Sequence, residues 1–379
     1  MDPDRQTMTR VELEVQGSRL VRVGETVGGC VGATVDLGGR YVVPGFVDTH
    51  VHGWGNPSPG DEKDDEEWGR LQTAQLSLKA GVVAFLDMAS EAEDWRARDR
   101  ARASDDHAHI YSALMLSTGG RDERSARESL RSQLGLNPDI IKLFAGGEHI
   151  GAMVDEASRV KRSTVVHIAS WEEAEAAVGA GATAITHLED EVVIPFALAR
   201  EMARRGTISI PTLSVQCDLH GAFSGQKWLS DPLLARVTGP KLLAAYRDRA
   251  AYSKKSRRTL RWQKAGCRTN DFRSIRILQK AGVSILAGSD TGNLGVFQGY
   301  GVHREMALLN EAGLSTWQAL RAGTTAAARF LGHPAGIVPG GEATFVVLAG
   351  DPVKDIRNTS RIAMVVHRGR VVWDGGDSR

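Results

Sequence analysis

Cysteine is scarce in this sequence, and long apolar runs are absent from it. Its three cysteines, Cys30, Cys217 and Cys267, are widely spaced among 379 residues and form no Cys-x-x-Cys pair. They suggest neither a disulfide framework nor a thiolate zinc site. No stretch approaches the roughly 18 apolar residues of a membrane span, and the first residues do not resemble a signal peptide. We therefore expect a cytoplasmic protein that has no membrane partner.

A strong charge of one sign is also lacking. The 47 Lys and Arg residues nearly balance the 46 Asp and Glu residues, which leaves a formal net charge of +1. A chain with so little net charge has no overall field that attracts nucleic acid, so we expect no such partner. Hydrophobic residues make up 42% and charged residues 25%, as in ordinary globular proteins. The length fits a barrel of about 250 residues with a smaller second domain.

The middle of the chain alternates short β-branched runs with longer segments of helical character. This rhythm predicts a parallel sheet, and Gly-containing turns before several runs favour a closed (β/α)₈ TIM-like barrel, of class α/β, over an open doubly wound sheet. Eight strands are expected, at Tyr41–Asp48, Gly81–Met88, Ile110–Leu116, Ile140–Ala145, Ser163–Ala169, Ala184–Leu188, Ile208–Leu213 and Val283–Gly288.

The two ends of the chain show a different pattern. Residues 8–40 and 343–374 alternate apolar and polar residues with glycines at the turns, which is typical of hairpins. We expect both termini to form one small β-sandwich domain, so that residues 1–43 and 336–379 flank a barrel of residues 44–335. Two charge runs, Asp61–Glu67 and Lys254–Lys264, are interpreted as solvated helix faces.

The first expected barrel strand ends in a His-x-His pair, His50 and His52. In an extended segment residues i and i+2 point the same way, so both imidazoles can face one cation. The pair alone is a weak signal, because surface or core histidines share this spacing.

Three further ionisable residues fall at expected strand ends. His167 ends the fifth strand, His187 ends the sixth, and Asp290 follows the eighth. In a (β/α)₈ barrel these ends converge on the face that carries the active site. Each residue also has an ordinary structural interpretation, as a paired core group or a helix cap. Their joint placement favours a metal site.

Lys142 lies inside an apolar strand, where an unpaired lysine is costly to bury. A snorkelling or ion-paired lysine is one interpretation. The other is a lysine carboxylated at Nζ, because a carbamate is an anion that can bridge two metals.

The pattern closely resembles the amidohydrolase superfamily. Within that superfamily it is most similar to the imidazolonepropionase-like and metal-dependent peptidase branch. The resemblance extends over nearly the whole chain, from Val42 to Val371. Its most specific motifs are Phe46–His52, Ile141–Lys142 with Gly146–Gly147, Pro211–Ser214, Ala287–Gly292, and Gly313–Ser315 with Ala319–Thr324.

The resemblance implies two divalent metal ions, usually zinc, and hydrolysis of an amide or related C–N bond. Its implied ligands are His50, His52 and Asp290 on one metal, His167 and His187 on the other, and N6-carboxylated Lys142 between them. In such enzymes a metal-bound hydroxide attacks the carbonyl carbon. Asp290 would take a proton as general base and pass it to the leaving nitrogen as general acid.

Three departures from the family pattern bear on the surroundings of the ligands. Thr186 stands where relatives often carry Glu, and Ala169 stands where they often carry a second His. Both put the orientation of the ligands and the substrate contacts in doubt. Residues 341–344 replace a usual Lys-Asp-Ala-Asp stretch, which concerns the small β domain.

Two other functions are considered. A deaminase of the same superfamily would use one metal and a Glu three residues after the fifth-strand histidine, where this chain has Ser170. A non-enzymatic scaffold would typically have lost ligands, and none is missing.

Substrate contacts are expected from loops after the barrel strands. The candidates are Trp54, Asn56, His220 and Asn293. The short connection between Lys142 and His167 leaves little room for a lid, so we expect an open mouth. It would admit a peptide-like, N-acyl or cyclic amide substrate, or a bulky modified natural-product peptide. The sequence does not define the oligomeric state, and a homo-oligomer is left open.

Overall fold

The computed structural model describes residues 1–29, 32–60, 69–90, 94–118, 122–144, 149–262 and 269–375. The acidic run Asp61–Glu67, the pair Gly146–Gly147 and two of the cysteines lie outside these ranges. Cys217 is disulfide-bonded. The wide spacing of the cysteines, which suggested no disulfide framework, did not predict this bond.

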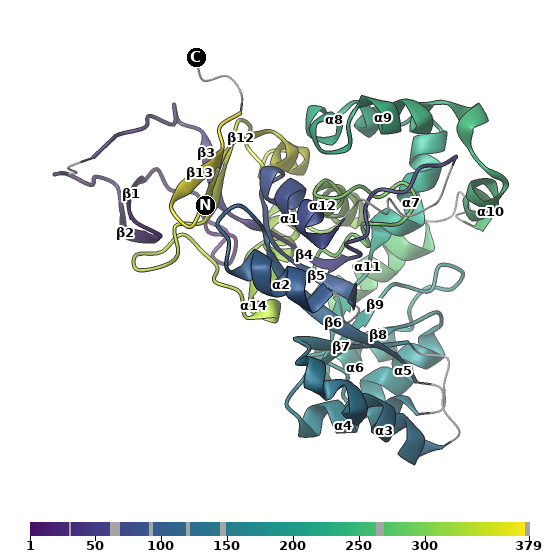
Figure 1. Cartoon of the computed structure of the whole chain (residues 1–379). Helices are drawn as coiled ribbons and strands as arrows, with labels where there is room; N and C mark the ends of the chain where they lie inside the picture. The colour runs from purple at the N-terminus through teal and green to yellow at the C-terminus, as the bar shows by residue number, and fades with distance from the viewer. Residues whose placement is uncertain are drawn as a thin grey trace.

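Seven consecutive parallel strands form the barrel sheet, in the order of the sequence (Figure 1). Each is a short run of β-branched or other apolar residues, as the sequence predicts. Their bounds are β4 (Phe46–Val51), β5 (Val82–Ser90), β6 (His109–Ser117), β7 (Ile140–Phe144), β8 (Ser163–His167), β9 (Ala184–Thr186) and β10 (Ile208–Ile210).

The eighth expected strand, Val283–Gly288, closes the barrel without forming a regular strand. On one side Leu286 N donates to Ser209 O at 2.9 Å, and on the other Thr49 N donates to Ala287 O at 3.0 Å. One isolated bridge, between Ile285 and Ser209, also joins the segment to β10. A Cβ at Gly288 would lie 2.5 Å from Ile210 Cγ2, so this close approach requires glycine.

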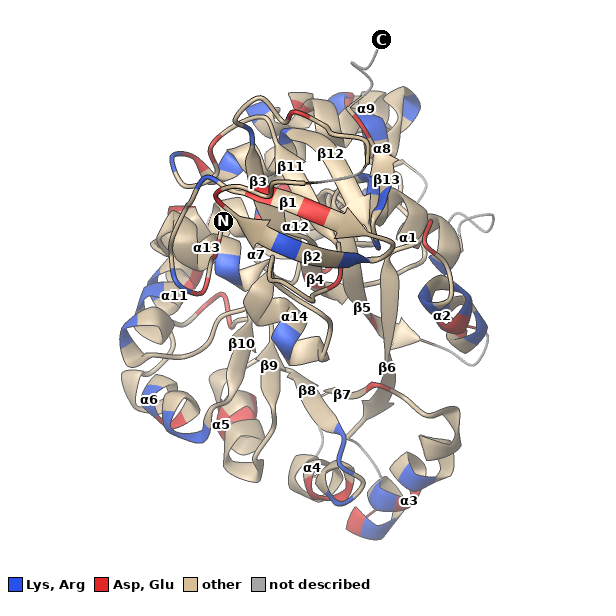
Figure 2. Ribbon diagram, turned by 90° about the vertical axis from the view of Figure 1, so that its left-hand side faces the viewer, with Lys and Arg blue, Asp and Glu red and all other residues tan. Residues whose placement is uncertain are grey.

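Helices follow the strands and cover the outside of the barrel, and many of their residues are charged (Figure 2). The helices between the strands are α1 (Arg70–Lys79), α2 (Asp94–Arg102), α3 (Glu123–Gln133), α4 (Ile150–Arg159), α5 (Trp171–Ala180) and α6 (Phe196–Arg205). Around and after the closing segment come α11 (Asn270–Ala281), α12 (Gly301–Ala312), α13 (Thr316–Ala322) and α14 (Thr325–Leu331).

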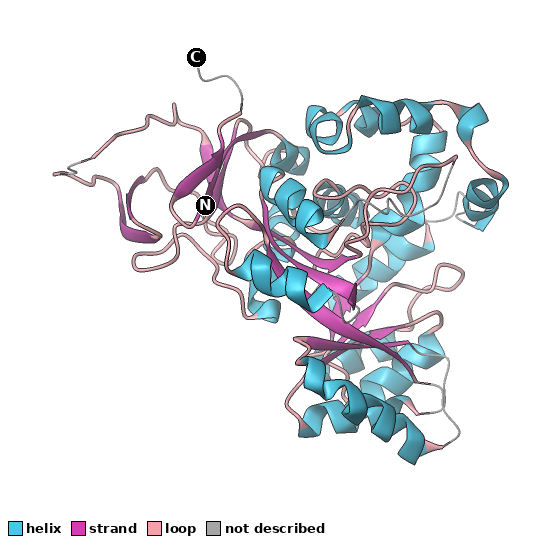
Figure 3. Ribbon diagram, in the orientation of Figure 1, coloured by secondary structure: helices cyan, strands magenta, loops and turns pink. Residues whose placement is uncertain are grey.

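Four helices are inserted between β10 and α11, at the upper right of Figures 1 and 3. They are α7 (Leu213–Phe223), α8 (Pro232–Thr238), α9 (Pro240–Arg247) and α10 (Lys254–Trp262). The charge run that begins at Lys254 is helical, as expected. The insertion itself was not predicted, and it changes the surroundings of the barrel mouth.

Both termini form the small β domain, as predicted. β1 (Glu12–Gln16) pairs with β2 (Arg19–Gly24), while β3 (Tyr41–Pro44), β11 (Phe345–Leu348), β12 (Ile362–His367) and β13 (Arg370–Trp373) form a four-stranded antiparallel sheet. Leu20 of β2 packs against Phe345, Val347 and Val366 of that sheet. The first expected strand, Tyr41–Asp48, is divided at Gly45 between this sheet and the barrel. Gly45 is needed there, because a Cβ would lie 2.4 Å from Val83.

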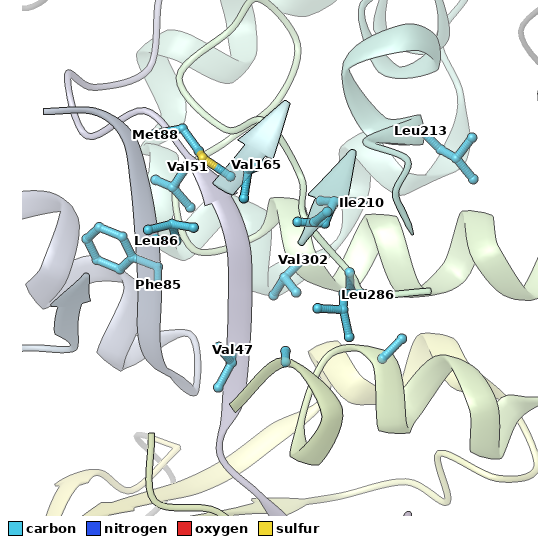
Figure 4. Packing of buried hydrophobic residues seen from close by; sticks show 14 of the residues in the cluster. Val47, Val51, Phe85, Leu86, Met88, Val165, Ile210, Leu213, Leu286 and Val302 are labelled. Carbon is cyan, nitrogen blue, oxygen red and sulfur yellow. The ribbon is translucent and has the colours of Figure 1, made fainter. Parts of the chain in front are cut away.

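The main hydrophobic core fills the barrel and the space between barrel and helices. Figure 4 shows Val51 of β4 close to Leu86 and Met88 of β5, with Val47 farther along the same strand, and all four belong to one cluster of buried side chains. This packing makes the strand ends a rigid platform for the polar residues that follow them. In the described ranges, no helix is both long and apolar enough to cross a membrane.

Candidate metal centre

Two strand ends bring an imidazole pair and a carboxylate together. Asp290 Oδ1 lies 3.2 Å from His50 Nε2 and 3.0 Å from His52 Nε2. The histidines come from β4 and the carboxylate from the turn after the closing segment, which are adjacent because Asp290 N donates to His50 O at 2.8 Å. All three side chains are nearly buried, with 0% exposure for His50. The structure therefore brings together the three residues expected on the first metal.

The two expected ligands of the second metal lie beside this group. The ring centroids of His167 and His187 are 4.3 Å apart, and those of His50 and His187 are 5.2 Å apart. Ligand atoms of His50, His187 and Asp290 all lie within 4.8 Å of one another, and these residues form a group suited to hold a metal ion. The four histidines and the aspartate thus face one small volume.

Lys142 reaches the same volume from β7. It is 1% exposed, and its Nζ lies 3.2 Å from His50 Nε2. Burial lowers the pKa of Lys142 to about 8, although the nearby carboxylates of Asp290 and Asp87 favour the charged form. The lysine amine therefore lies beside His50, one of the residues expected on the first metal.

Three residues at the mouth of the barrel adopt left-handed backbone conformations. The φ angles are 73° at His187, 52° at Thr212 and 58° at Asp290. Non-glycine residues rarely adopt this region, which costs on the order of 1 kcal/mol or more unless the surroundings fix it. Such strain is typical of functional sites. Here the left-handed conformation directs the side chains of His187 and Asp290 toward the common volume.

Several neighbouring residues hold these ligands in place. Asp48 Oδ1 accepts hydrogen bonds from His50 N at 3.1 Å and from Ser289 N at 2.9 Å, which ties β4 to the closing segment. Thr212 Oγ1 lies 2.7 Å from His187 Nδ1. Asn293 Nδ2 donates to Asp290 Oδ1 at 2.9 Å. Only Asn293 was a candidate beforehand, and it was expected to contact substrate.

Helix α7 begins beside Thr212 and is anchored by a buried carboxylate. Glu305 of α12 accepts hydrogen bonds from Leu213 N and Ser214 N at 3.0 and 2.8 Å, at the N-terminus of α7. Sequence spacing could not reveal this contact, because about ninety positions separate its partners.

Burial and mutual proximity set the protonation of the centre. Burial lowers the pKa of His50 and of His187 well below its usual range, and it lowers that of His167 to about 4. Burial alone would raise the pKa of Asp290, but the neighbouring imidazoles outweigh it and hold that pKa well below its ordinary value. Neutral imidazoles facing an ionised carboxylate are the donor set that zinc and similar divalent ions prefer. The residues present therefore fit the expected metals.

A cavity of about 730 Å³ opens onto this group. His167, His187 and Asp290 line it together with Trp54 and Asn293. Its walls come from the loop after β9, from α7 and from Lys255 and Thr259 of α10, so part of the basic run lines the cavity.

The other two substrate candidates lie elsewhere. Asn56 Oδ1 accepts a hydrogen bond from Gln298 N at 2.7 Å, and His220 lies near the end of α7. Neither is among the described residues that line the cavity. The structure therefore gives them no contact with a substrate bound there.

Fold and site together define a (β/α)₈-barrel hydrolase with a histidine- and aspartate-rich metal centre. A model of the amidohydrolase family matches residues 41–372. The chain therefore belongs to the amidohydrolase family, and it is a metal-dependent hydrolase that acts on carbon–nitrogen bonds.

Solved structures share this fold at low sequence identity. A Xaa-Pro dipeptidase with bound methionine is 18% identical, with a TM-score of 0.78 over 99% of this chain and 98% of that one. A prolidase in complex with N-methylphosphonate-L-proline is 23% identical, with a TM-score of 0.72 over 98% and 96%. A bottromycin amidohydrolase is 22% identical, with a TM-score of 0.66 over 97% and 83%. No curated protein matches the chain.

Proposed function

We propose that this chain is a binuclear metallohydrolase that cleaves an amide bond in a peptide-like or N-acyl substrate. The observation that carries the proposal is the convergence of ligands from five strand ends. His50, His52 and Asp290 would hold one metal, His167 and His187 the other, and carboxylated Lys142 would lie between them. Zinc is the proposed metal because nitrogen donors predominate.

When bound, the two ions would lower the pKa of a water molecule and polarise the scissile carbonyl. The chain itself supplies the proton transfers. We assign to the Asp290 carboxylate the role of taking the proton from the attacking water and giving it to the leaving nitrogen. Asn293 Nδ2 donates to Oδ1 of that carboxylate at 2.9 Å, so Oδ2 would be the oxygen that takes the proton. Trp54, stacked on His52 at 4.3 Å between ring centroids, would shield one side of the centre from water.

The proposed substrate is an extended peptide-like molecule. The cavity volume of about 730 Å³ exceeds what a single-ring substrate requires and lies within the usual range for ligand sites. One structural neighbour is named a Xaa-Pro dipeptidase, another is a prolidase in complex with N-methylphosphonate-L-proline, and a third is named a bottromycin amidohydrolase. A tailoring hydrolase acting on a modified peptide is therefore the second candidate within the same chemistry.

A deaminase of this superfamily would carry a Glu three residues after the fifth-strand histidine. In this chain that position is Ser170, which caps a helix. Ser170 is the N-cap of α5, and its Oγ accepts a hydrogen bond from Glu173 N at 3.3 Å. A capping hydroxyl cannot replace the carboxyl group that protonates a ring in that reaction. The arrangement thus favours amide hydrolysis.

Metal content and substrate range test the proposal together. Purified protein should contain about two divalent ions per chain by elemental analysis. With zinc, manganese or cobalt it should hydrolyse members of a panel of dipeptides, N-acyl amino acids, cyclic amides and lactones. One ion per chain with ammonia release from an aminated ring would favour a deaminase. Protein that binds no metal and turns over nothing would contradict the enzymatic proposal.

A further inference from the structure

We infer that Thr186 is a positioning residue that fixes the protonation site of the His50 ring, so that Nε2 is the nitrogen left free to bind metal. The inference rests on the proposed function, because it assumes that His50 binds a metal ion. Its geometry is taken from hydrogen bonds within the chain itself. The sequence marked Thr186 only as a departure from the family pattern. In the structure it lies at the end of β9 and contacts the histidine across the barrel.

The direction of the hydrogen bonds follows from the single proton of a hydroxyl. Thr186 Oγ1 donates to Ile210 O at 3.2 Å, and it also lies 2.8 Å from His50 Nδ1. A carbonyl oxygen can only accept, so the hydroxyl proton is used there. His50 Nδ1 must then carry a proton and donate it to Oγ1. A neutral ring has one N–H, which leaves Nε2 with its lone pair.

The opposite edge of the ring agrees with this assignment. His50 Nε2 lies 3.2 Å from Lys142 Nζ and 3.2 Å from Asp290 Oδ1. An amine can donate to an unprotonated ring nitrogen, whereas a lone pair and a carboxylate oxygen repel each other unless a cation lies between them. Two independent sets of contacts thus place the lone pair toward the shared volume.

The other histidines show that this arrangement is selective. The Nδ1 atoms of His52 and His167 are buried and have no hydrogen-bond partner within the described ranges, whereas Nδ1 of His187 lies 2.7 Å from Thr212 Oγ1. His50 and His187 are also the two histidines of the compact group formed with Asp290. Each proposed ion thus has one ligand whose ring is held by a threonine hydroxyl, His50 on the first and His187 on the second.

Replacing Thr186 by valine would remove the hydroxyl while changing little else. Thr186 is fully buried, and valine has nearly the same shape. Ile210 O keeps a donor, because His187 N also donates to it at 2.9 Å. The main loss is the acceptor for His50 Nδ1, which frees the ring to rotate or to exchange its proton between nitrogens.

Titration with Co²⁺, followed by its visible absorption, tests the inference in the full-length protein. Losing such an outer hydrogen bond typically weakens metal binding about 10- to 100-fold, and we expect this loss for T186V. T186S keeps a hydroxyl and should bind within about threefold of the wild type. T359V removes another fully buried hydroxyl far from the centre and should leave binding unchanged. T186V that folds and binds Co²⁺ as tightly as T186S would overturn the inference.

The wild-type protein provides a test that needs no variant to fold. In metal-free protein labelled with ¹⁵N-histidine, long-range proton–nitrogen spectra report which ring nitrogen carries the proton. We expect His50 in the Nδ1-protonated form, and the Nε2-protonated form would overturn the inference. If the wild type bound no Co²⁺ while His50 showed the expected form, the proposed function would fail and the role of Thr186 would stand.

Discussion

The carboxylate of Asp290 meets two imidazoles through the same oxygen, at 3.2 Å from His50 and 3.0 Å from His52. Its backbone is left-handed, with φ of 58°, and Asn293 holds its Oδ1. An asparagine at this position could still offer an oxygen to a metal, but it could not accept a proton. The residue is thus the place where metal binding and proton transfer can be separated experimentally.

We expect Asp290→Asn to lower kcat by about 10²- to 10⁴-fold, the usual contribution of a general base. Metal content measured by elemental analysis should remain near the wild-type level. Asp106→Asn, at an exposed position, is the matched control and should leave kcat unchanged. Undiminished turnover in Asp290→Asn would refute the assignment of the base.

At the residue scale, sequence reasoning found the groups that point into the centre and missed those that hold them. His167 and His187 stand at the ends of β-branched runs, so their position follows from strand periodicity alone. Thr186, Thr212 and Glu305 act through contacts between elements far apart in the chain. Such contacts depend on how the barrel closes, which no local pattern encodes.

Helices α7 and α12 are joined by a buried ion pair. Arg304 donates two hydrogen bonds to Asp218, at 2.9 and 3.2 Å, and the two residues are 7% and 2% exposed. Because α12 also carries Glu305, this pair lies in the same interface that supports the start of α7. Removing one partner would leave an uncompensated buried charge.

We expect Asp218→Asn to destabilise the protein by roughly 3–5 kcal/mol, measured as the free energy of unfolding in urea. Glu128→Gln is the matched control, because the Arg124–Glu128 pair is 87% and 55% exposed and its removal should leave the free energy of unfolding nearly unchanged. Equal effects of the two substitutions would show that the buried pair does not stabilise this interface.

At the scale of elements, the strands could be predicted and the helical insertion could not. The barrel strands are short apolar runs separated by helical segments, which is a strong pattern. Helix α7 has buried residues on most of its surface, including Leu213, Cys217 and Leu219, so it lacks the contrast between faces that reveals a helix in a sequence. The segment before Asp290 has a strand pattern in the sequence, yet it is joined to its neighbours by a few backbone hydrogen bonds and one isolated bridge and forms no regular strand.

Across the whole molecule, buried histidines outside the metal centre link stability to pH. Burial lowers the pKa of His303, His333 and His367 to about 4 in each case, against an ordinary value of 6.5. His303 Nε2 donates to Ala80 O at 3.0 Å, while its Nδ1 is buried without a partner in the described part of the chain. These rings fold in the neutral form, and each must gain a proton when the chain unfolds below pH 6.5.

The sign of the pH effect follows from proton uptake. Between about pH 6.5 and pH 4 these three rings bind more protons in the unfolded chain than in the folded one, so their contribution to stability is complete above pH 6.5 and declines as pH falls toward 4. We expect Tm to decrease steadily across this window. His303→Phe, which removes one titrating ring, should give a shallower decrease. A Tm that stays constant from pH 7 to pH 4.5 would contradict the neutral, buried state of these histidines.

The whole molecule combines a closed barrel, a small β domain from both termini and a metal centre at the carboxyl ends of the strands. The family match from residue 41 to 372 supports the hydrolase chemistry, and the cavity supports an extended substrate. The central claim is that the expected metal ligands, which are distant from one another in the sequence, face one small volume in the fold.

Anomalous diffraction from crystals grown with zinc would test this claim most directly. The account predicts two peaks about 3.5–4 Å apart, with His50, His52 and Asp290 on one and His167 and His187 on the other. Density for a carbamate on Lys142 should lie between them. Zinc peaks elsewhere, or none at this centre in fully loaded crystals, would contradict the account.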